Sequence, residues 1–441
     1  DDPDTHWRNS LTCQHPMHQR PRLEPGLYNC SRMQKHFHRR WQQIRQAIIQ
    51  DLQHLIDEFA DKTAQWLEAR PQHVKKAYQS RDGACTQIPV LLHLAHLLQM
   101  PGLDLLTDEL NQGFHMIGAI NPGTGWRRRA DNKYQQPLDL ETFHQLNHEF
   151  IQDKLQSHKV DPYANTMAKE IADEVASHRM NGPYRAPANW CKPTTSLPDF
   201  EHTSEVKDLP SQPILTSVAF AIHQIGSDGK NKIRRGEDWR RSFHNSTIQA
   251  IDAPHHHNIQ CYVDLARHIH RPGLNLKLWG QDHEGAYRQL PVRDPAQTGV
   301  ILFTTHGPTL WTHNVLLFGA TASVWGYNRF GDIMIWLPRA LMGIPALHYV
   351  DDFGSIDEPD LVDSAFYAFT EFHDLLNFKM KPSKAQPPKE SHKMQGVIID
   401  IHCDFIQIQA EPRRRQRMIS SLQRILDADQ LKPDEAATVA G

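Results

Sequence analysis

Apolar side chains recur at helical spacing along the first 160 residues. From Met33 to Phe59 they return every three or four positions, which predicts one amphipathic helix of about thirty residues. Shorter helices are expected at Val90 to Gln99, at Leu103 to Asn111 with its end at Gly113, and after a cap at Asp139. Residues 1–160 are therefore predicted to form a helical N-terminal region, and their sequence indicates no role for it.

The pattern changes after residue 160. Residues 161–213 include a stretch rich in Pro, Ser and Thr, which predicts a connector. Beyond it, "ILTSVAFAIHQ", "LNLKLWGQD" and "KMQGVIIDIH" have the composition of strands, whereas "VLLFGATASVWGYNRF" and the segment from Leu361 to Leu376 have that of helices. Because strands and helices are interleaved, the predicted fold class is α+β.

Composition and length describe an ordinary globular chain. It has 441 residues, of which 39% are hydrophobic and 22% charged, enough for two or three domains. The sequence contains no apolar run of membrane-spanning length, and its first residues lack the layout of a secretory signal, so no membrane partner is expected. Its cysteines form no CxxC pair, which favours an intracellular location, cytoplasmic or nuclear. We expect the chain to be a piece of a longer one.

Two histidine-containing stretches invite a metal-site interpretation. Zinc binding by the first is left open, because the spacing of its residues matches no standard finger; they are Cys13, His15, His18, Cys30, His36 and His38. The second, His255 to His257, follows a proline and is predicted to be a solvated loop.

An adjacent pair of carboxylates ends an apolar run in "PALHYVDDFGSID". Asp351 and Asp352 are either the tip of a hairpin closed by Phe353-Gly354 or part of a metal site. Two carboxylates alone are a poor site for two divalent cations, because Mg²⁺ requires several oxygen ligands. Asp282, at the end of the predicted strand "LKLWGQD", can supply a third acid if that strand lies beside the hairpin; otherwise it is an ordinary turn residue.

Basic residues cluster although the formal net charge is only −3. Residues 230–241 contain six basic residues against two acidic ones, residues 379–393 contain five Lys against one Glu, and residues 413–417 contain four Arg. Such clusters around one site would form a groove that attracts a phosphate backbone.

The order of these features between residues 219 and 399 resembles the reverse transcriptase family, of the retrotransposon type. The matching segments are "KNKIRRGEDWRR", with Arg234 four residues before Asp238; "QDHEGAYRQLPV", with Asp282 and Tyr287; "LLFGATASVW"; "HYVDDFG"; "NFKMKPSK", with Lys384; and "MQGVII", around Gly396. The chain departs from the family pattern at Ser323-Val324 and at Asn245.

The resemblance implies the fingers and palm of a right-hand polymerase, with an antiparallel palm sheet and flanking helices. Fingers are expected at 214–270, the palm at 271–400, and the start of a thumb or connection region at 401–441. The implied metal ligands are Asp282, Asp351 and Asp352, and Lys384 is an implied catalytic residue. The implied substrate-binding residues are Lys230, Lys232, Arg234, Gly285, Ala286, Tyr287, Phe318 and Gly319; those of a primer grip are Met394, Gln395 and Gly396.

The resemblance also implies an activity. It is RNA-directed DNA polymerisation within a retroelement polyprotein: two Mg²⁺ or Mn²⁺ ions would support transfer of dNTPs to a primer 3′-hydroxyl on an RNA or DNA template. Tyr287 would exclude the ribose 2′-hydroxyl, although it can equally be a core aromatic, and Lys384 can be merely solvated. The alternative function is a catalytically silent nucleic-acid-binding relic. An RNA-directed RNA polymerase is disfavoured by Tyr287, and no acids of a ribonuclease H are visible.

Overall fold

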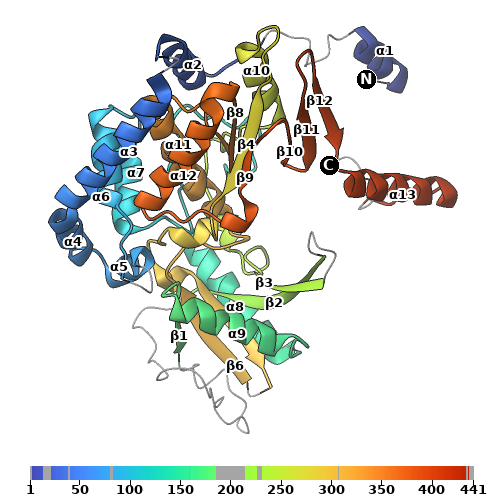
Figure 1. Cartoon of the computed structure of the whole chain (residues 1–441). Coiled ribbons are helices and arrows are strands. Elements are labelled where there is room, and N and C mark those ends of the chain that lie inside the picture. The colour runs from blue at the N-terminus through green and yellow to red at the C-terminus, as the bar shows by residue number, and fades with distance from the viewer. Residues whose placement is uncertain are drawn as a thin grey trace.

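The structure is a computed structural model of the whole chain (Figure 1). It describes residues 2–12, 21–37, 40–79, 83–157, 159–184, 214–225, 231–305, 307–433 and 436. None of the helices in these ranges combines the length and the apolar character that crossing a membrane requires. The connector residues 185–213, Lys230 and four of the histidine and cysteine residues considered for zinc (Cys13, His15, His18 and His38) lie outside the described residues.

Helices make up the described N-terminal region, as predicted. They are α1 (Pro3–Thr12), α2 (Pro25–Phe37), α3 (Trp41–Glu58), α4 (Ala60–Glu68), α5 (Gln72–Tyr78), α6 (Ile88–Leu97), α7 (Leu103–Gln112) and α8 (Leu140–Ser157). Gly113, with φ +94°, ends α7, and the Asp139 carboxylate caps α8 by accepting from the backbone N–H of Thr142 at 2.9 Å. Both ends were predicted from the sequence.

The single helix predicted from Met33 to Phe59 is wrong, because α2 ends at Phe37 and α3 begins at Trp41. Trp41 turns back toward α2, and its indole N–H donates to the carbonyl of Gln34 at 3.2 Å. The Gln34 side chain in turn donates to Asp357 at 2.8 Å, while α3 packs along α12. The turn between α2 and α3 thus lets Trp41 pack back onto α2 while α3 lies along α12, which one straight helix could not do.

The predicted connector contains regular structure at its start. Residues Ala164–Ala176 form helix α9, and Met180–Tyr184 form strand β1, which pairs antiparallel with β6. The expectation of a connector over all of 161–213 is therefore wrong for this part. Residues such as Met167, Ile171 and Met180 are buried here against the strands, so the segment contributes to a core.

A five-stranded sheet lies in the lower part of Figure 1. Its strand order is β1-β6-β5-β2-β3, with β2 (Thr216–Ile225), β3 (Asn231–Glu237), β5 (Gly299–Thr304) and β6 (Gly307–His313). All its pairs are antiparallel except β2 with β5. Residues 299–313, expected to belong to the palm, thus share a sheet with residues 216–237, expected to be fingers.

A second sheet, of four antiparallel strands in the order β7-β8-β4-β9, lies above the first one in Figure 1. Its strands are β4 (Lys277–Asp282), β7 (Leu347–Tyr349), β8 (Asp352–Asp357) and β9 (Gln386–Lys389). Helices α10 (Ile259–Ile269), α11 (Thr321–Met342) and α12 (Pro359–Leu375) pack beside it. One buried apolar cluster joins α11 and α12 to the N-terminal helices, including Leu52, Leu110, Phe330 and Phe369. The N-terminal helices therefore share one core with the sheet. Each such buried side chain contributes roughly 1.5–3 kcal/mol to the stability of the fold.

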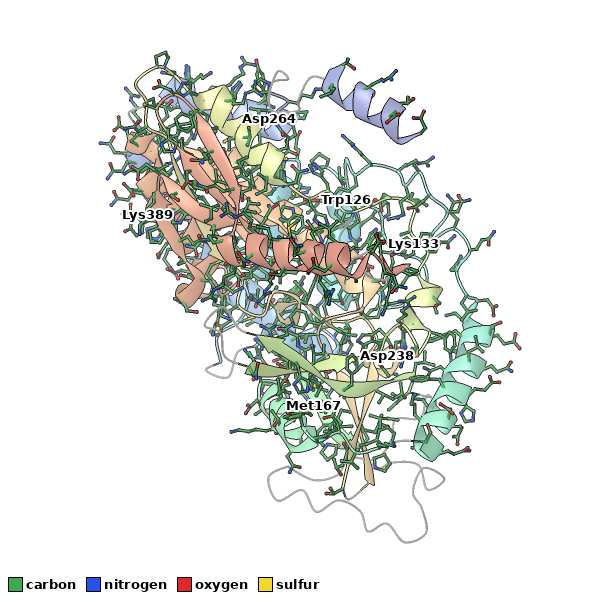
Figure 2. The ribbon with its side chains drawn as sticks, turned by 90° about the vertical axis from the view of Figure 1, so that its right-hand side faces the viewer. Trp126, Lys133, Met167, Asp238, Asp264 and Lys389 are labelled. Atoms are coloured by element: carbon green, nitrogen blue, oxygen red, sulfur yellow. The ribbon has the colours of Figure 1, made fainter. Side chains whose placement is uncertain are left out.

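A small sheet and a final helix complete the described chain. Strands β10 (Ser391–Met394), β11 (Val397–Ile401) and β12 (Ile406–Ala410) form the sheet, and α13 (Pro412–Ala428) follows it. The single strand predicted for "KMQGVIIDIH" is wrong, because Gln395 and Gly396 turn the chain with φ of +48° and +83°. Figure 2 looks onto this side, with Lys389 of β9 above and Asp238, just after β3, below. The predicted α+β class, with antiparallel sheets after a helical region, is confirmed.

Candidate functional site

Three carboxylates meet at the end of the four-stranded sheet. Strands β4 and β8 run antiparallel, and in their register Asp282 lies directly opposite Asp352. Tyr349 pairs with Asp352 across β7 and β8, so Val350 and Asp351 form a two-residue turn. The predicted adjacency of the Asp282 strand and the hairpin is therefore confirmed.

The turn differs from the one considered in the sequence. Phe353 and Gly354 do not close the hairpin, because both are buried inside strand β8. The turn lies before them, and Val350 has φ +54°, which a β-branched residue rarely adopts. Such strain persists only where the surroundings fix it, and it is frequent at functional sites.

The acids repel one another electrostatically. Burial, the negative charges of Asp351 and Asp282, and a hydrogen bond with Asp282 together raise the pKa of Asp352 from 3.8 to about 6, against the opposing charge of Lys384. Burial and the charge of Asp282 also raise the pKa of Asp351. These carboxylates are thus held together without enough positive charge to balance them, which is a property of sites that take up cations.

Lys384 supplies part of the missing charge. Its ammonium donates to Asp282 Oδ2 at 2.5 Å, although 53% of its side chain is exposed. Burial alone would lower the pKa of Lys384, but the hydrogen bond to Asp282 and the charges of the three carboxylates raise it. The backbone holds Lys384 nearby, because Lys381 N–H donates to the Asp282 carbonyl at 2.8 Å and Lys384 N–H to that of Lys381 at 2.9 Å.

Two side chains beneath the carboxylates were not singled out from the sequence. The Tyr327 hydroxyl on α11 lies 2.6 Å from Nδ1 of His283, and both side chains are buried. Burial, and then the charge of Asp351, raises the pKa of Tyr327, while burial lowers that of His283. His283 N–H donates to the Asp351 carbonyl at 3.3 Å, so this pair supports the turn from below. Its position next to Asp282 was the available signal for His283, whereas Tyr327 had none.

Tyr287 lies between two other aromatic rings. Its centroid is 5.3 Å from that of Phe318 and 5.2 Å from that of Tyr327, both in edge-to-face geometry. Tyr287 is partly buried, and burial followed by the charge of Asp351 raises its pKa. Phe318 is 55% exposed, so it extends the aromatic surface toward solvent. The structure thus brings Tyr287, Phe318 and Asp351 together.

The backbone around these rings is unusual at two places. Gly285, with φ +69°, precedes the short helical turn Ala286–Gln289 that carries Tyr287, and Ala286, with φ +23°, is its first residue. Gly319 has φ +83°, and its carbonyl accepts from the side chain of Asn245 at 3.0 Å. The Asn245 side chain also accepts from the backbone N–H of Thr321 at 2.8 Å, so it joins the segment predicted to be fingers to the start of α11. The sequence marked Asn245 only as a departure from the family.

A cleft of about 1200 Å³ runs past the carboxylates. Asp282, Asp352 and Lys384 line it together with the β10–β11 turn, which contains the predicted grip residues. Those residues are Met394, Gln395 and Gly396, and all of them line the cleft. Lys393 and Arg414 also line it, so cations border the cleft next to the acids.

The predicted fingers residues lie on strand β3. Lys232 and Arg234 are both exposed there, opposite Gln224 and Ile222 of β2. Arg235, their neighbour, points the other way and forms a buried ion pair with Glu237 at 3.3 Å. In Figure 1 the hairpin of β2 and β3 projects from the same side of the molecule as β10, β11, β12 and α13.

The donor set at the carboxylates fits divalent cations. Three carboxylates provide the hard oxygen ligands that Mg²⁺ and Mn²⁺ prefer, and the cationic ammonium of Lys384 already contacts one of them.

The described residues considered for zinc, Cys30 and His36, offer a different set of donor atoms. Cys30 is buried, and burial raises the pKa of its thiol to about 12, whereas a zinc ligand must be a thiolate.

The sequence matches no protein-family model, and no curated protein matches it. Among solved structures, that of the foamy viral protease-reverse transcriptase in complex with RNA/DNA hybrid is 14% identical, with a TM-score of 0.40 over 61% of this chain and 31% of that one. The foamy viral enzyme in complex with dsDNA is 13% identical, with a TM-score of 0.39 over 80% of this chain and 62% of that one. The chain thus spans less than two thirds of either protein, and function has to be argued from the site itself.

Proposed function

We propose that the protein is an RNA-directed DNA polymerase, which adds dNTPs to a primer 3′-hydroxyl. The observation that supports this most is the strand register, which sets Asp282 opposite Asp352 and next to the Asp351 turn. The raised pKa values of Asp351 and Asp352 support it as well, because clustered carboxylates that repel one another are stabilised when cations bind between them.

Asp282 and Asp351, with Asp352 beside them, would hold two Mg²⁺ or Mn²⁺ ions. Bound there, the ions would lower the pKa of the primer hydroxyl and neutralise the leaving pyrophosphate. Lys384 would release Asp282 when the ions bind. Its ammonium, freed within the same cleft, would then be placed to donate a proton to the pyrophosphate.

Tyr287 would contact the sugar of the incoming nucleotide. Its ring is fixed between Phe318 and Tyr327, so it cannot turn aside easily, and a 2′-hydroxyl would collide with it. The backbone of Gly285 and Ala286, which has no large side chain, would approach the triphosphate oxygens. Arg234 and Lys232, exposed on β3, would with Lys230 compensate the triphosphate charge, and Phe318 and Gly319 would position the nucleotide against its template.

The β10–β11 turn would hold the primer end. Met394, Gln395 and Gly396 line the same cleft as Asp282 and Asp352, and the neighbouring Lys393 and Arg414 suit a phosphate backbone. The template would be RNA or DNA, and the chain would work as one part of a retroelement polyprotein.

Primer extension tests this proposal. The purified chain is given a primed RNA template, or a DNA template of the same sequence, with Mg²⁺ and either dNTPs or rNTPs. We expect extension on the RNA template with dNTPs, and a decrease of at least about a thousandfold in Asp282→Asn because a metal ligand is lost. Glu284→Gln, which removes an exposed acid two residues away, is the matched control and should stay active.

The same experiment tests the relic alternative. A chain that binds the primed template with nanomolar to micromolar affinity but extends it in neither metal, with no difference between wild type and Asp282→Asn, would be a silent nucleic-acid-binding protein. Extension with rNTPs in preference to dNTPs would instead contradict the assignment of Tyr287.

A further inference from the structure

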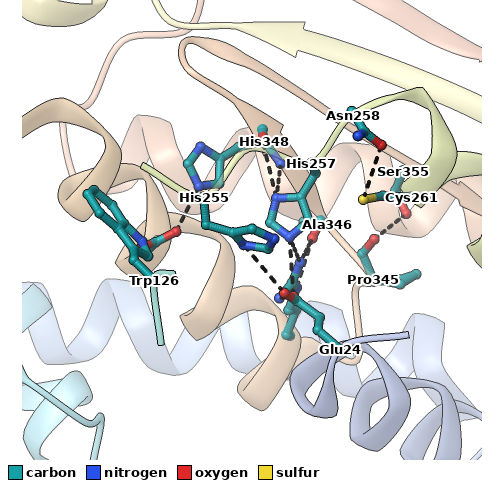
Figure 3. Close-up of polar contacts among 12 residues, drawn as sticks. Glu24, Trp126, His255, His257, Asn258, Cys261, Pro345, Ala346, His348 and Ser355 are labelled. Carbon is teal, nitrogen blue, oxygen red and sulfur yellow. Dashed lines mark hydrogen bonds and ion pairs between the residues drawn. The ribbon is translucent and has the colours of Figure 1, made fainter. Parts of the chain in front are cut away.

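A second cluster of ligand-type side chains lies away from the three aspartates. Among the described residues, Glu24, His255 and His257 each offer one ligand atom, and these atoms lie within 4.8 Å of one another. Figure 3 shows both histidines directed at the Glu24 carboxylate. Glu24 immediately precedes α2, and the histidines precede α10, so the cluster joins segments more than two hundred residues apart. The prediction that His255 to His257 form a solvated loop is wrong for His257, which is 2% exposed.

The ligand atoms of this cluster lie close enough to converge on one tetrahedral ion. His257 Nε2 lies 3.2 Å from Glu24 Oε1, and His255 Nδ1 lies 3.8 Å from the other carboxylate oxygen, Oε2. Zinc bonds to nitrogen and oxygen are about 2.0–2.2 Å, so neighbouring ligand atoms of a tetrahedral site are roughly 3.3–3.6 Å apart. One oxygen of Glu24 and both nitrogens lie within 4.8 Å of one another, so rotation of the Glu24 carboxylate and of the more exposed His255 would bring the set to that range.

The backbone orients one of the ligands. His257 Nδ1 lies 3.1 Å from the carbonyl of His348, which orients the ring so that Nε2 faces Glu24.

Arg339 already contacts two of the proposed ligands, so an ion would share the cluster with its guanidinium. Its guanidinium pairs with Glu24 Oε1, and its Nη2 lies 3.2 Å from His257 Nε2. Arg339 is also held by the Ala346 carbonyl, to which Nε donates at 2.8 Å and Nη2 at 2.5 Å. An ion bound by His257 would replace the contact between Arg339 and His257, while Arg339 stays bound to the Ala346 carbonyl.

We propose that Glu24, His255 and His257 form a zinc site whose fourth position is open to water. A cavity of about 480 Å³, lined by the three ligands and Arg339, gives an ion and a water molecule access from one side. Two histidines and one carboxylate are a ligand set that zinc accepts, whereas Mg²⁺ prefers oxygen alone. This proposal does not depend on polymerase activity.

The site would brace two segments of the candidate active site. His257 N–H donates to the His348 carbonyl at 3.0 Å, on the strand that leads to Asp351. The His257 carbonyl accepts from the Gln395 side chain at 2.7 Å, in the β10–β11 turn. An ion that fixes His257 to Glu24 would therefore anchor both hairpins to the N-terminal segment.

Zinc titration of the metal-stripped full chain tests the proposal. With a chromogenic chelator as competitor, we expect wild type to bind zinc at this site and His255→Gln to bind one equivalent less, or at least about tenfold more weakly. His255 is chosen because 43% of its side chain is exposed, so its loss leaves the core intact. His270→Gln, which removes another exposed histidine, is the matched control and should bind as wild type does. Mg²⁺ in place of zinc should not compete.

Cobalt substitution separates this site from one made by the cysteines. We expect visible d–d bands without the near-ultraviolet charge-transfer band of a thiolate ligand, and their loss in both His255→Gln and Glu24→Gln. Unchanged zinc stoichiometry and affinity in these variants, no zinc binding by wild type, or a thiolate band that accounts for all bound cobalt would overturn the proposal and leave an Arg339 ion-pair network alone.

Discussion

At the scale of single residues, Asp352 makes the candidate site sensitive to pH. Its pKa of about 6 lies above the ordinary 3.8, so the folded state binds this proton more tightly than the unfolded chain does. In the absence of metal, the ionised carboxylate therefore destabilises the fold fully above about pH 6, and this cost disappears as the pH falls toward 4. Metal binding has the opposite dependence, because a protonated carboxyl group is a poor ligand.

We therefore predict two effects of pH. At sub-saturating Mg²⁺, polymerase activity should fall as the pH decreases through about 6, because protons then compete with the cations for Asp352. In chelator, Asp352→Asn should raise Tm by roughly 2 °C at pH 7.5 and change it less at pH 4.5. Thermal unfolding of wild type and variant at both pH values measures this, with Asp400→Asn in the peripheral sheet as control. A variant that is equally destabilised at both pH values would contradict the assigned charge repulsion.

Tyr287 is predicted to select deoxynucleotides by a steric clash. Replacing it with Ala or Val should raise incorporation of rNTPs relative to dNTPs by at least about tenfold, equivalent to roughly 1.4 kcal/mol of differential transition-state binding. Tyr287→Phe, which keeps the ring, is the matched control and should preserve selectivity. The measurement is kcat/KM for a matched dNTP and rNTP pair.

The alternative for Tyr287 predicts a different outcome. If the ring served only in packing against Phe318 and Tyr327, its truncation would lower stability and reduce both activities together. An unaltered ratio in a folded Tyr287→Ala variant would therefore mean that the sugar pocket lies elsewhere.

Single functional residues could be predicted from the sequence where a side chain of that type is rare in its local sequence pattern. Asp351 and Asp352 attract notice because carboxylates seldom end an apolar strand. Tyr327 and His283 could not be found in the same way, because a Tyr on a helix and a His beside a strand are common. Their role depends on the 2.6 Å contact between α11 and the end of β4, which no local pattern encodes.

At the scale of elements, the β10–β11 turn depends on Gly396. This residue has φ +83°, and a Cβ there would lie 2.4 Å from Arg414 Nη1. Gly396→Ala should therefore strain the turn by about 1–2 kcal/mol and raise the KM for primed template about fivefold or more. The KM for dNTP should change little, because the turn is proposed to hold the primer.

Gly273→Ala is the matched control for this prediction. Gly273 also has positive φ, +81°, but a Cβ there would meet nothing within 4 Å. The control therefore carries a similar backbone cost outside the cleft. If both variants weakened primer binding equally, the effect would come from general destabilisation, and the assignment of the turn would be contradicted.

Elements were predicted well where one local signal dominates and poorly where two compete. The ends of α7 and α8 were found because Gly113 and Asp139 are strong stop and start signals. The break between α2 and α3 was missed because helical spacing continues through it. The packing of Trp41 on α2 and of α3 along α12 decides that break, and it is tertiary information.

At the scale of the whole molecule, Arg45 joins the N-terminal helices to the sheet that carries the acids. It is 1% exposed, and its guanidinium donates to the carbonyls of Met342, Gly343 and Leu361. It also lies 3.8 Å from Asp357 at the end of β8. Burial raises the pKa of Asp357 to about 6, and Arg45 opposes that rise. The N-terminal region is thus built onto the rest of the described chain through a buried cation.

We predict that Arg45→Met lowers the free energy of unfolding by about 3 kcal/mol at pH 7.5, because it leaves the buried Asp357 carboxylate without the cation of its ion pair. The loss should be smaller at pH 5, where Asp357 can be protonated. Urea unfolding measures it, with the exposed Arg40→Met as the matched control. Equal effects of the two variants would mean that the N-terminal helices do not depend on this contact.

The assembly of the sheets is where the sequence was least informative. Strands from residues 180–184, 216–237 and 299–313 combine in one sheet, so the order of segments along the chain does not give the boundary that was predicted between fingers and palm. Alternation of apolar residues identifies a strand but not its partner. The pairing of β4 with β8 was an exception, because the hypothesis that Asp282 and Asp351 share cations requires neighbouring strands.

The central claim is that Asp282 and Asp351 hold two catalytic cations, and anomalous scattering from Mn²⁺ tests it most directly. Crystals of the protein with primed template, Mn²⁺ and a non-hydrolysable dNTP should show two ions about 4 Å apart, each within about 2.5 Å of a carboxylate oxygen of Asp282 or Asp351. Lys384 Nζ should have left Asp282 Oδ2, from which it is now 2.5 Å away. Absence of manganese between β4 and the Asp351 turn, with nucleotide and template bound, would contradict the account.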